Sequence, residues 1–414
     1  MRVLVGIALA HLLNRKRQSA VSVGGVALGV GFFIGMAAMM SGFQSYFIAK
    51  VIDVSPHITM KDEYRSAPLQ PAALVYRGGA VSLQGQRPLD ELRGIREARA
   101  TMAEIERVGG VAVAPTLRGP IILRYGSKDV SGTIVGIEPE RERRVTNLER
   151  DLEAGRLEGL YATANGVILG AGMAEKLGIG MGDTVSAISP AGVVMSMKVT
   201  GIVRTGITTI DNFEGYALLK KVQILQNRAN IVNQIRMRLT DVTLAGETAR
   251  RLEERYGYRT ESWEEANKNV LGIFVIQNAI MYTSVGAILV VAGFGIFNIL
   301  STVIFEKTRD IAILRSLGFT EGDIRTIFVL EGLAVGLGGT LLGWALGFGI
   351  TEFLGSLKFS VEGFVKTEGF VLDRSFRHYW MVALFALAVS VFAAFLPARR
   401  AARVRPVDII RSAA

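Results

Sequence analysis

Four long runs of apolar residues with very few charges dominate the pattern of this chain. They cover about residues 19–49, 270–305, 324–357 and 379–396. A helix needs about 20 apolar residues to cross the hydrocarbon core of a bilayer, so each run predicts a membrane-spanning helix. The stretch between the first and second runs is long, polar and rich in turn residues, which predicts an aqueous domain.

The second apolar run is longer than a bilayer requires. Residues 273–305 would form a helix of about 50 Å at ~1.5 Å per residue, whereas the hydrocarbon core is about 30 Å thick. We therefore expect the second helix, and the first through about Val51, to continue beyond the outer surface as stalks. The first run also exceeds the apolar core of about 7 to 15 residues of a cleaved signal peptide, which predicts a retained helix.

The N-terminal segment has a weaker apolar pattern. Val3, Leu4, Ile7 and His11 recur at helical spacing, which predicts a short helix lying along the inner membrane interface. A cytoplasmic extension of the first membrane helix is an equally good interpretation of the same residues.

Composition agrees with a mixed protein. Half of the residues are apolar and 20% are charged, and the mean hydropathy is +0.35. This composition is too hydrophobic for a soluble chain and too polar for a chain that lies entirely in the membrane.

The positive charges lie at the ends of the apolar runs. The formal charge is +10, which suggests nucleic-acid binding, but the chain has no basic stripe with interleaved aromatic residues, no zinc finger and no helix-turn-helix pattern. Lys and Arg beside membrane helices mark the cytoplasmic side. Both termini and the loop between the second and third helices are therefore predicted inside, and the aqueous domain outside. The three clusters are Arg15, Lys16 and Arg17; Lys307, Arg309 and Arg315; and Arg399, Arg400, Arg403 and Arg405.

The predicted fold class is an α-helical membrane protein with four transmembrane helices and a large extracytoplasmic mixed α/β domain inserted between helices one and two. The predicted segments are an interfacial helix (1–17), the first membrane helix and stalk (18–50), the periplasmic domain of two subdomains (51–265), the second stalk and membrane helix (266–305), a cytoplasmic coupling helix (306–320), the third membrane helix (321–357), a short periplasmic loop (358–377), the fourth membrane helix (378–397) and a cytoplasmic tail (398–414).

Strand and helix patterns interleave within the aqueous domain without a long βαβ regularity, so several small sheets with packed helices are expected rather than a doubly wound fold. Residues 65–87 are rich in Pro and Gly and predict a loop between the two subdomains. The predicted strands are 110–114, 120–125, 130–137, 184–188, 193–203 and 235–239. The predicted helices are 89–106, 171–177, 217–226 and 244–256.

Residues for catalysis or metal binding are not found in a recognisable arrangement. His11, His57 and His378 are far apart along the chain, and there is no cysteine, so neither a metal-ligand cluster nor a disulfide is expected. There is no G-x-S-x-G sequence and no phosphate-binding loop. Acidic residues of the aqueous domain lie mostly in Arg-rich helices such as ARRLEERYG, residues 249–257, which indicates a solvated face of ion pairs. The chain is not predicted to be an enzyme, and any nucleotide must be bound by another subunit.

Two features of the apolar runs concern packing. Glycines recur four residues apart in the first and third runs, a spacing that lets helix backbones approach closely within or between protomers. Glu331 lies about two turns inside the third run. A buried ionisable group in a membrane helix is partnered or functional, and we expect a pair with a cytoplasmic-side Arg or Lys in preference to a transport role.

The charged segment between the second and third helices is amphipathic. Ile311, Leu314 and Leu317 are expected on one helix face, and Gly318 is placed to end the helix. One interpretation is a docking helix for a soluble partner, and the other is a charged loop that only fixes topology.

A resemblance to a known family favours the docking helix. The stretch EKTRDIAILRSLGFTEGDI, residues 306–324, resembles the coupling segment of the MacB and FtsX superfamily of ABC transporter permeases, and LPARRAARVRPVDIIR, residues 396–411, resembles their closing segment. Within the superfamily the chain is most similar to the lipoprotein-releasing permeases of the Lol system. The residues concerned are MSGFQSYFIAKVIDVSPHI, VSGTIVGIEPERE, ILGAGMAEKLGIGMGDTVSAISP and FNILSTVIFEKTRDIAILRSLG. Glu331, where a Lol permease is expected to have Gln, is more similar to the wider superfamily.

The resemblance implies a function and a set of partners. The chain would be an inner-membrane permease that extracts lipoproteins from the outer leaflet and passes them to a periplasmic lipoprotein carrier. It would work as a dimer with a second copy or a related permease. The alternatives are a MacB-like export permease and an FtsX-like regulator of a cell-wall hydrolase, which transports nothing.

The resemblance also implies two sites and no cofactor in this chain. ATP and magnesium would be bound by a separate dimer of ABC ATPases. The positions implied for ATPase coupling are Glu306, Lys307, Thr308, Arg309, Asp310, Ile311, Leu314, Arg315, Leu317 and Gly318. The positions implied for a cavity that takes lipid chains are Met40, Gly42, Phe43, Phe47, Ile273 and Ile276.

Overall fold

The computed structural model describes residues 2–63, 75, 94–107, 109–358, 360–362 and 365–403. Most of the loop predicted at 65–87 and the closing segment from residue 404 lie outside the described residues. The chain divides into two compact units. The helical unit comprises Met1–Tyr46, Gly272–Phe359 and Glu368–Ala414, and the α/β unit comprises Phe47–Leu271 and Ser360–Thr367.

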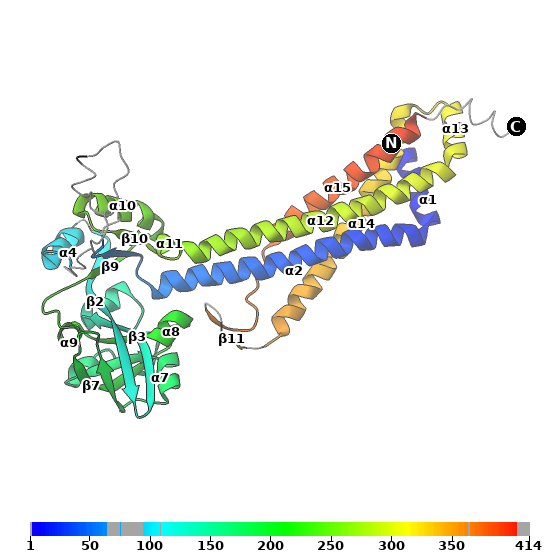
Figure 1. The fold of residues 1–414 in the computed structure, drawn as a ribbon. Coiled ribbons are helices and arrows are strands. Elements are labelled where there is room, and N and C mark those ends of the chain that lie inside the picture. The colour runs from blue at the N-terminus through cyan, green and yellow to red at the C-terminus, as the bar shows by residue number, and fades with distance from the viewer. Residues whose placement is uncertain are drawn as a thin grey trace. The chain divides into compact units, whose positions relative to one another are not determined.

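Four helices in the described part of the chain are long and apolar enough to cross a membrane, as the four apolar runs predict. Two of them, α2 and α12, have 39 residues each, which corresponds to about 58 Å at ~1.5 Å per residue. Both therefore exceed the hydrocarbon core, as their sequences predict. The four helices are α2 (Lys16–Val54), α12 (Lys268–Glu306), α14 (Glu321–Ser356) and α15 (Phe376–Ala402), drawn from blue to red in Figure 1.

Two shorter helices accompany them in the helical unit. The first, α1 (Arg2–Asn14), is separated from α2 at Arg15. Its buried Ala8 and partly buried Leu4, Ile7 and Leu12 pack against the core of the unit. The second, α13 (Thr308–Ser316), lies between α12 and α14 and is shorter than the predicted segment 306–320.

The fourth membrane helix is longer than its sequence predicts. The prediction ends this helix at Pro397, where the apolar run gives way to Arg399 and Arg400. The structure instead continues α15 through Pro397 to Ala402. Ala398, Ala401 and Ala402 are buried in the core of the helical unit, and this packing keeps the last turn helical.

Glycines allow α14 to approach α2 closely. A Cβ atom at Gly343 would lie 2.5 Å from Cβ of Val30, and one at Gly347 would lie 2.7 Å from Cβ of Ile34. These distances are below van der Waals contact, so only glycine fits. About two turns earlier on the same face, α14 meets α15 in the same way, since a Cβ atom at Gly336 would lie 2.8 Å from Ser390. The glycines spaced four residues apart therefore allow close helix packing within this chain, as predicted.

Ten described strands of the α/β unit form one mixed sheet. The strands are β1 (Ile58–Lys61), β2 (Val111–Tyr125), β3 (Lys128–Ile137), β4 (Leu152–Gly155), β5 (Gly166–Gly170), β6 (Thr184–Ile188), β7 (Val194–Val203), β8 (Glu214–Leu218), β9 (Gln234–Leu239) and β10 (Thr260–Ser262). The helices that accompany them are α4 (Ala98–Arg107), α5 (Pro139–Val145), α6 (Gly159–Ala162), α7 (Ala171–Leu177), α8 (Thr208–Phe213), α9 (Leu219–Leu225), η1 (Val242–Leu244), α10 (Ala245–Tyr256) and α11 (Trp263–Ala266). A separate pair of short strands, β11 (Ser360–Glu362) and β12 (Lys366–Glu368), lies between α14 and α15 in the chain.

Six of these strands close into a ring. Strand β2 pairs with β3, β3 with β8, β8 with β5, β5 with β7, β7 with β6, and β6 with β2 again. Alternate residues point into the ring, as strand geometry requires, and are apolar. Leu117, Ile121 and Leu123 of β2 contribute to this core together with Val167 and Leu169 of β5. The ring is therefore a small barrel filled with side chains.

Strand β2 also joins the barrel to a second region of the sheet. Its first half pairs with β9, and β9 pairs with β1, which pairs with β10. The prediction of several small sheets is therefore wrong, because one strand of 15 residues belongs to both regions. The prediction instead places two strands here, 110–114 and 120–125, and leaves residues 115–119 between them.

Candidate functional site

The segment that the sequence singles out for ATPase coupling forms a short helix with a defined end. Gly318 follows the last turn of α13 with φ of 99°, a conformation that strains residues with a side chain. The Phe319 amide donates to the Leu314 carbonyl at 3.2 Å, and the Gly318 amide donates to the Arg315 carbonyl at 3.2 Å. This pair of bonds is the Schellman motif, and Gly318 ends the helix as predicted.

The next helix begins immediately after this turn. Thr320 caps α14: its hydroxyl accepts from the Asp323 amide at 3.2 Å, and the Asp323 carboxylate accepts from the Thr320 amide at 2.9 Å. Only three residues of turn separate Ser316 from this cap. The position of α13 relative to α14 is therefore fixed by hydrogen bonds at both sides of the turn.

One face of α13 packs against the helical unit. Ile311 and Ala312 are buried, and Leu314 and Phe319 are partly buried in the same core. Leu317, predicted on this face, is 72% exposed. The prediction for Leu317 is wrong because Leu317 lies four residues after the exposed Ile313 and therefore shares its side of the helix, away from Ile311.

Exposed residues lie on the opposite side. We call them the α13 stripe, which consists of Phe305 near the end of α12, Arg309 and Ile313 of α13, and Leu317 in the turn that follows α13. Phe305 is 82% exposed and Ile313 is 47% exposed. Large apolar side chains in this setting, around one cation, are typical of a protein-binding surface.

Neighbouring charges are already paired. Lys307 binds Asp310 at 2.7 Å and Arg315 binds Glu321 at 3.4 Å. Glu306 forms an ion pair with Arg15. Arg309 has no ion pair within the described part of the chain, so its charge is available to a partner.

The turn at Gly318 gives a direct test of how α13 is held. Gly318→Ala is expected to lower the stability of the helical unit by about 1–2 kcal/mol, the cost of a left-handed backbone for a residue with a Cβ atom. Gly322→Ala is the matched control, because Gly322 is helical and a Cβ atom there would lie 3.5 Å from its nearest neighbour, the Thr320 hydroxyl. The control should be neutral or stabilising by up to about 1 kcal/mol. Thermal unfolding of the purified chain in detergent compares the two, and equal shifts would contradict the assignment.

The positions implied for the lipid cavity lie at one end of α2 and α12 and have different surroundings. Phe43 stacks edge to face with Phe274, with ring centroids 6.0 Å apart. Ile273 and Ile276 are 41% and 61% exposed. Met40 is partly buried against the core of the helical unit. These four positions present apolar surface, and their cavity role stays a prediction.

The other two positions are enclosed. Gly42 leaves no room for a side chain because the Val371 backbone lies against it. Phe47 is 3% exposed and belongs to the α/β unit. Neither position presents an accessible side-chain surface in this structure.

The segment before α15 is fastened to α2 beside Gly42. The Asp373 amide donates to the Ala38 carbonyl at 2.9 Å, and the Ser41 hydroxyl donates to the Asp373 carboxylate at 2.8 Å. The same carboxylate lies 3.2 Å from Nε2 of His378. Burial opposes ionisation of Asp373, but these hydrogen bonds outweigh it and hold the pKa of the carboxyl below its ordinary value.

The partner of the buried Glu331 differs from the prediction. Its carboxylate lies 2.6 Å from Nδ1 of His11 on α1; an Arg or Lys was expected. Glu331 is 2% exposed and His11 is 20% exposed. Sequence spacing could not reveal this pair, because the two residues are 320 positions apart.

Comparisons with known proteins match both parts of the chain. A profile described as the MacB-like periplasmic core domain matches residues 19–255, and one described as the FtsX-like permease C-terminal domain matches residues 282–406. The lipoprotein-releasing system transmembrane protein LolC of Xylella fastidiosa is 27% identical over 98% of each chain. LolE of Haemophilus influenzae is 26% identical over 94% of this chain and 92% of that protein.

A relative named for a different transport activity also matches almost the whole of this chain. The macrolide export ATP-binding/permease protein MacB 2 of Aeromonas hydrophila is 25% identical over 98% of this chain but only 60% of its own length. The core-domain profile alone covers more than half of the present sequence, and the permease profile covers most of the remainder. This chain therefore belongs to the MacB and FtsX superfamily of ABC transporter permeases.

Proposed function

We propose that this chain is the permease subunit of an ATP-driven transporter that extracts lipoproteins from the outer leaflet of the inner membrane. It would pass them to a periplasmic carrier for sorting to the outer membrane. The α13 stripe is the observation on which the proposal rests, because it offers an apolar and cationic surface between two membrane helices. Relatives named as lipoprotein-releasing proteins support the cargo.

The proposed topology follows from the charges. Arg15, Lys307 and Arg399 each belong to a basic cluster at a membrane-helix end, and such clusters remain in the cytoplasm. Both termini and α13 are then cytoplasmic, and the α/β unit is periplasmic. The match to a domain described as periplasmic supports the same orientation.

The coupling of ATP hydrolysis to transport would depend on the contacts that anchor α13 to the helical unit. A separate ATPase dimer, which binds ATP and magnesium, would dock on Phe305, Ile313 and Leu317 and pair an acidic group with Arg309. Because α13 is packed through Ile311 and ends in a hydrogen-bonded turn, a displacement of the ATPase would be transmitted to α12 and α14. A second copy or a related permease would complete the transporter.

The cargo would enter where α2 and α12 expose apolar residues. Acyl chains would lie against Ile273, Ile276 and Phe43, since exposed apolar side chains accept lipid without losing hydrogen bonds. Export of another compound is the second candidate, favoured by the relative named for macrolide export. Mass spectrometry of the chain purified in mild detergent separates the two: a bound triacylated lipoprotein supports release, and its absence together with a bound macrolide supports export.

Docking is tested by placing a charge on the α13 stripe. Ile313→Asp is expected to reduce ATPase retention during copurification at least tenfold. Burying an isoleucine side chain stabilises a contact by about 1.5–3 kcal/mol. A tenfold loss of affinity corresponds to only about 1.4 kcal/mol. Lipoprotein release should fall in parallel.

The control for this experiment is Val194→Asp, the same type of change at a residue of β7 that is 64% exposed. It should leave ATPase retention unchanged. Retention that is undiminished in Ile313→Asp would show that the partner docks elsewhere. Retention that falls equally in both variants would point to general damage to the protein.

A further inference from the structure

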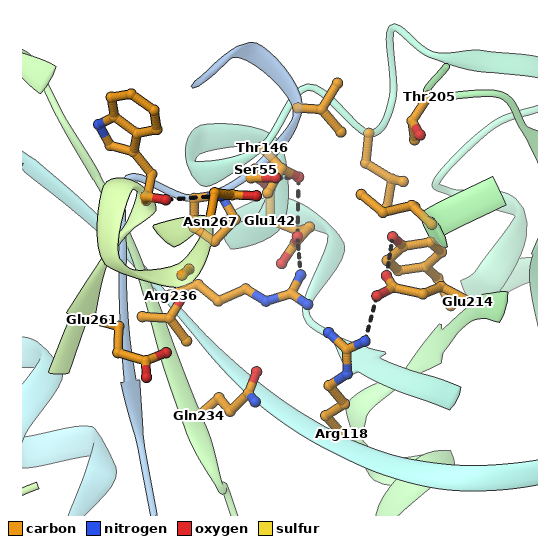
Figure 2. A pocket seen from close by; sticks show the side chains of 18 of the residues that line it. Ser55, Arg118, Glu142, Thr146, Thr205, Glu214, Gln234, Arg236, Glu261 and Asn267 are labelled. Atoms are coloured by element: carbon orange, nitrogen blue, oxygen red, sulfur yellow. Dashed lines mark hydrogen bonds and ion pairs between the residues drawn. The ribbon is translucent and has the colours of Figure 1, made fainter. Parts of the chain in front are cut away.

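A polar cavity of about 300 Å³ lies within the α/β unit. It is bounded by strands β1, β9 and β10 on one side, by α5 on another and by barrel strands β2 and β8 on a third (Figure 2). Its volume is at the lower end of the range of about 300–1,000 Å³ found for small-molecule sites. The permease function proposed above assigns no role to this space.

One wall of the cavity is a face of the sheet made of polar residues. Arg236 of β9 and Glu261 of β10 both lie opposite Thr59 of β1, which separates them. The next row places Gln234 of β9 opposite Lys61 of β1. All five residues line the cavity. Burying polar groups costs free energy unless they find partners, so a wall of this composition indicates a polar occupant.

The guanidinium of Arg236 enters the cavity from this wall. Its Nη1 donates to Oε1 of Glu142 on α5 at 3.0 Å, and the Arg236 side chain is 8% exposed. Glu142 lies on the side of this guanidinium that faces away from Arg118 (Figure 2). A guanidinium has donors on three nitrogens. Nε and Nη2 of Arg236 make no hydrogen bond within the described part of the chain, so they remain available.

A second guanidinium, that of Arg118 on β2, enters from the barrel side. Its Nη2 donates to Glu214 of β8 at 2.6 Å, and the Tyr216 hydroxyl donates to the other Glu214 oxygen at 2.8 Å. Burial, reinforced by Glu214, raises the pKa of Tyr216 well above its ordinary value, so the phenol remains a donor. Nε and Nη1 of Arg118 make no hydrogen bond within the residues that the structure describes. The Arg118 side chain is 39% exposed, so a small solute can reach the cavity here.

The carboxylates of the cavity are already engaged or enclosed. Lys61 binds Oε2 of Glu261 at 2.5 Å, and Arg259 binds Oε1 of the same residue from beside the cavity. Both oxygens of Glu214 are occupied. Oε1 of Glu142 accepts from Arg236, and its Oε2 is enclosed by protein. The charged groups left to a ligand are therefore guanidinium donors, which bind an acceptor.

The guanidinium groups of Arg118 and Arg236 point toward each other (Figure 2). Like charges that face each other repel, and an anion bound between them would offset this repulsion. The planar fork of a guanidinium matches the oxygens of a carboxylate or a phosphate. A phosphate monoester carries about −1.5 to −2 charge and would face three carboxylates in the same cavity. A singly charged carboxylate meets less of this repulsion and is the better fit.

We propose that this cavity binds a small organic monocarboxylate, whose carboxylate accepts hydrogen bonds from Arg118 and Arg236. The remaining lining includes apolar groups from Leu148, Ile210 and Trp263, which suit a short apolar tail. The ligand occupies the α/β unit, independently of the lipid and ATPase contacts proposed above.

Trp263 provides a reporter, because it lines the cavity. The chain has three tryptophans, and Trp344→Phe with Trp380→Phe leaves Trp263 as the single fluorophore. The full chain in lipid nanodiscs is titrated with isovalerate, and a saturable change in Trp263 fluorescence is expected. Isovaleramide has the same shape without the charge and should bind at least tenfold more weakly. Inorganic phosphate, which lacks the apolar tail, should also bind more weakly than isovalerate.

Variants of one strand test the assigned contacts. Arg118→Met should weaken isovalerate binding at least tenfold, because it removes charge-assisted hydrogen bonds to the ligand. The matched control is Arg124→Met, the same change on β2 at an exposed pair with Asp129, which should bind like the parent protein. If Arg118→Met does not fold, Arg118→Lys replaces it. Lysine keeps a cation beside Glu214 but lacks the planar fork, so binding should still fall at least threefold.

The opposing results are equally definite. A fluorescence change that never saturates, equal binding of isovalerate and isovaleramide, or parental binding in the Arg118 variant that folds would each overturn the proposal and leave bound water as the occupant. Phosphate binding more tightly than isovalerate would overturn the assignment to a monocarboxylate.

Discussion

Gly343→Leu is expected to prevent stable packing of α14 against α2 and to remove most of the protein from the membrane fraction. The first added carbon would lie 2.5 Å from Cβ of Val30 and 3.0 Å from the Ala27 carbonyl oxygen. One of these neighbours is backbone and cannot rotate away, so the helices must separate. The contacts on either side of Gly343 are equally close, and the separation would break them too.

The size of the effect follows from this geometry. Adding one or a few carbon atoms to a packed core costs about 1–3 kcal/mol when the structure can adjust. Here the adjustment would move a whole helix, and membrane helices have little apolar driving force to offset the lost contacts. We therefore expect a loss above about 3 kcal/mol.

Gly349→Leu is the matched control, because it makes the same change on the same helix. A Cβ atom at Gly349 would have no neighbour within 4 Å, so this variant should accumulate and unfold like the parent protein. Thermal unfolding in detergent and the amount recovered from membranes measure both variants. A Gly343→Leu protein as stable as Gly349→Leu would mean that α2 and α14 do not pack as described.

The helical unit could be predicted largely from sequence because its signals are local. An apolar run fixes a membrane helix by length alone, and glycines four residues apart share a face wherever the helix lies. The end of α13 can also be predicted from sequence, since Gly318 both stops the helix and starts the turn. The prediction for Leu317 is wrong because Leu317 shares a helix side with the exposed Ile313, four residues earlier, and not with Ile311.

The barrel could not be predicted because its closure depends on pairs distant in sequence. Strand β5, Gly166–Gly170, is fully buried and too short to show alternation, and residues 217–218 were assigned to a helix although they end β8. Pro115, which cannot donate a backbone hydrogen bond to a neighbouring strand, lies in the gap between the two strands predicted there. Tertiary pairing on both sides of β2 overrides that local preference.

Buried charges were missed for a similar reason. The sequence predicts a solvated face for acidic residues in Arg-rich helices, and this holds for Glu247, which pairs with Arg251 while both are more than half exposed. It is wrong for Glu142, which lies in an equally Arg-rich helix but is 0% exposed. Its partner comes from β9, 94 residues away, so no local pattern distinguishes the two cases.

Arg236→Met is expected to lower the free energy of unfolding of the α/β unit by about 3–5 kcal/mol, the cost of breaking a buried ion pair from one side. The side chain of Arg236 is 8% exposed and that of Glu142 is 0% exposed. Removing the guanidinium leaves the carboxylate without a counter-charge and with only the Thr146 hydroxyl as donor. The loss should shrink at acidic pH, where the variant can bury a neutral carboxylic acid.

The matched control is Arg124→Met, which removes the same group from an exposed pair. Arg124 binds Asp129 at 2.7 Å with both side chains about half exposed, and such surface pairs contribute about 0–1 kcal/mol. Chemical unfolding of the full chain, with Trp344→Phe and Trp380→Phe so that Trp263 is the single fluorophore, compares the two variants.

A double variant separates the missing partner from the missing packing. In Arg236→Met with Glu142→Leu, no buried charge remains at this pair, so most of the lost stability should return. If the double variant is as unstable as Arg236→Met, the guanidinium stabilises the unit mainly through its packing, and the ion-pair explanation of the loss is wrong.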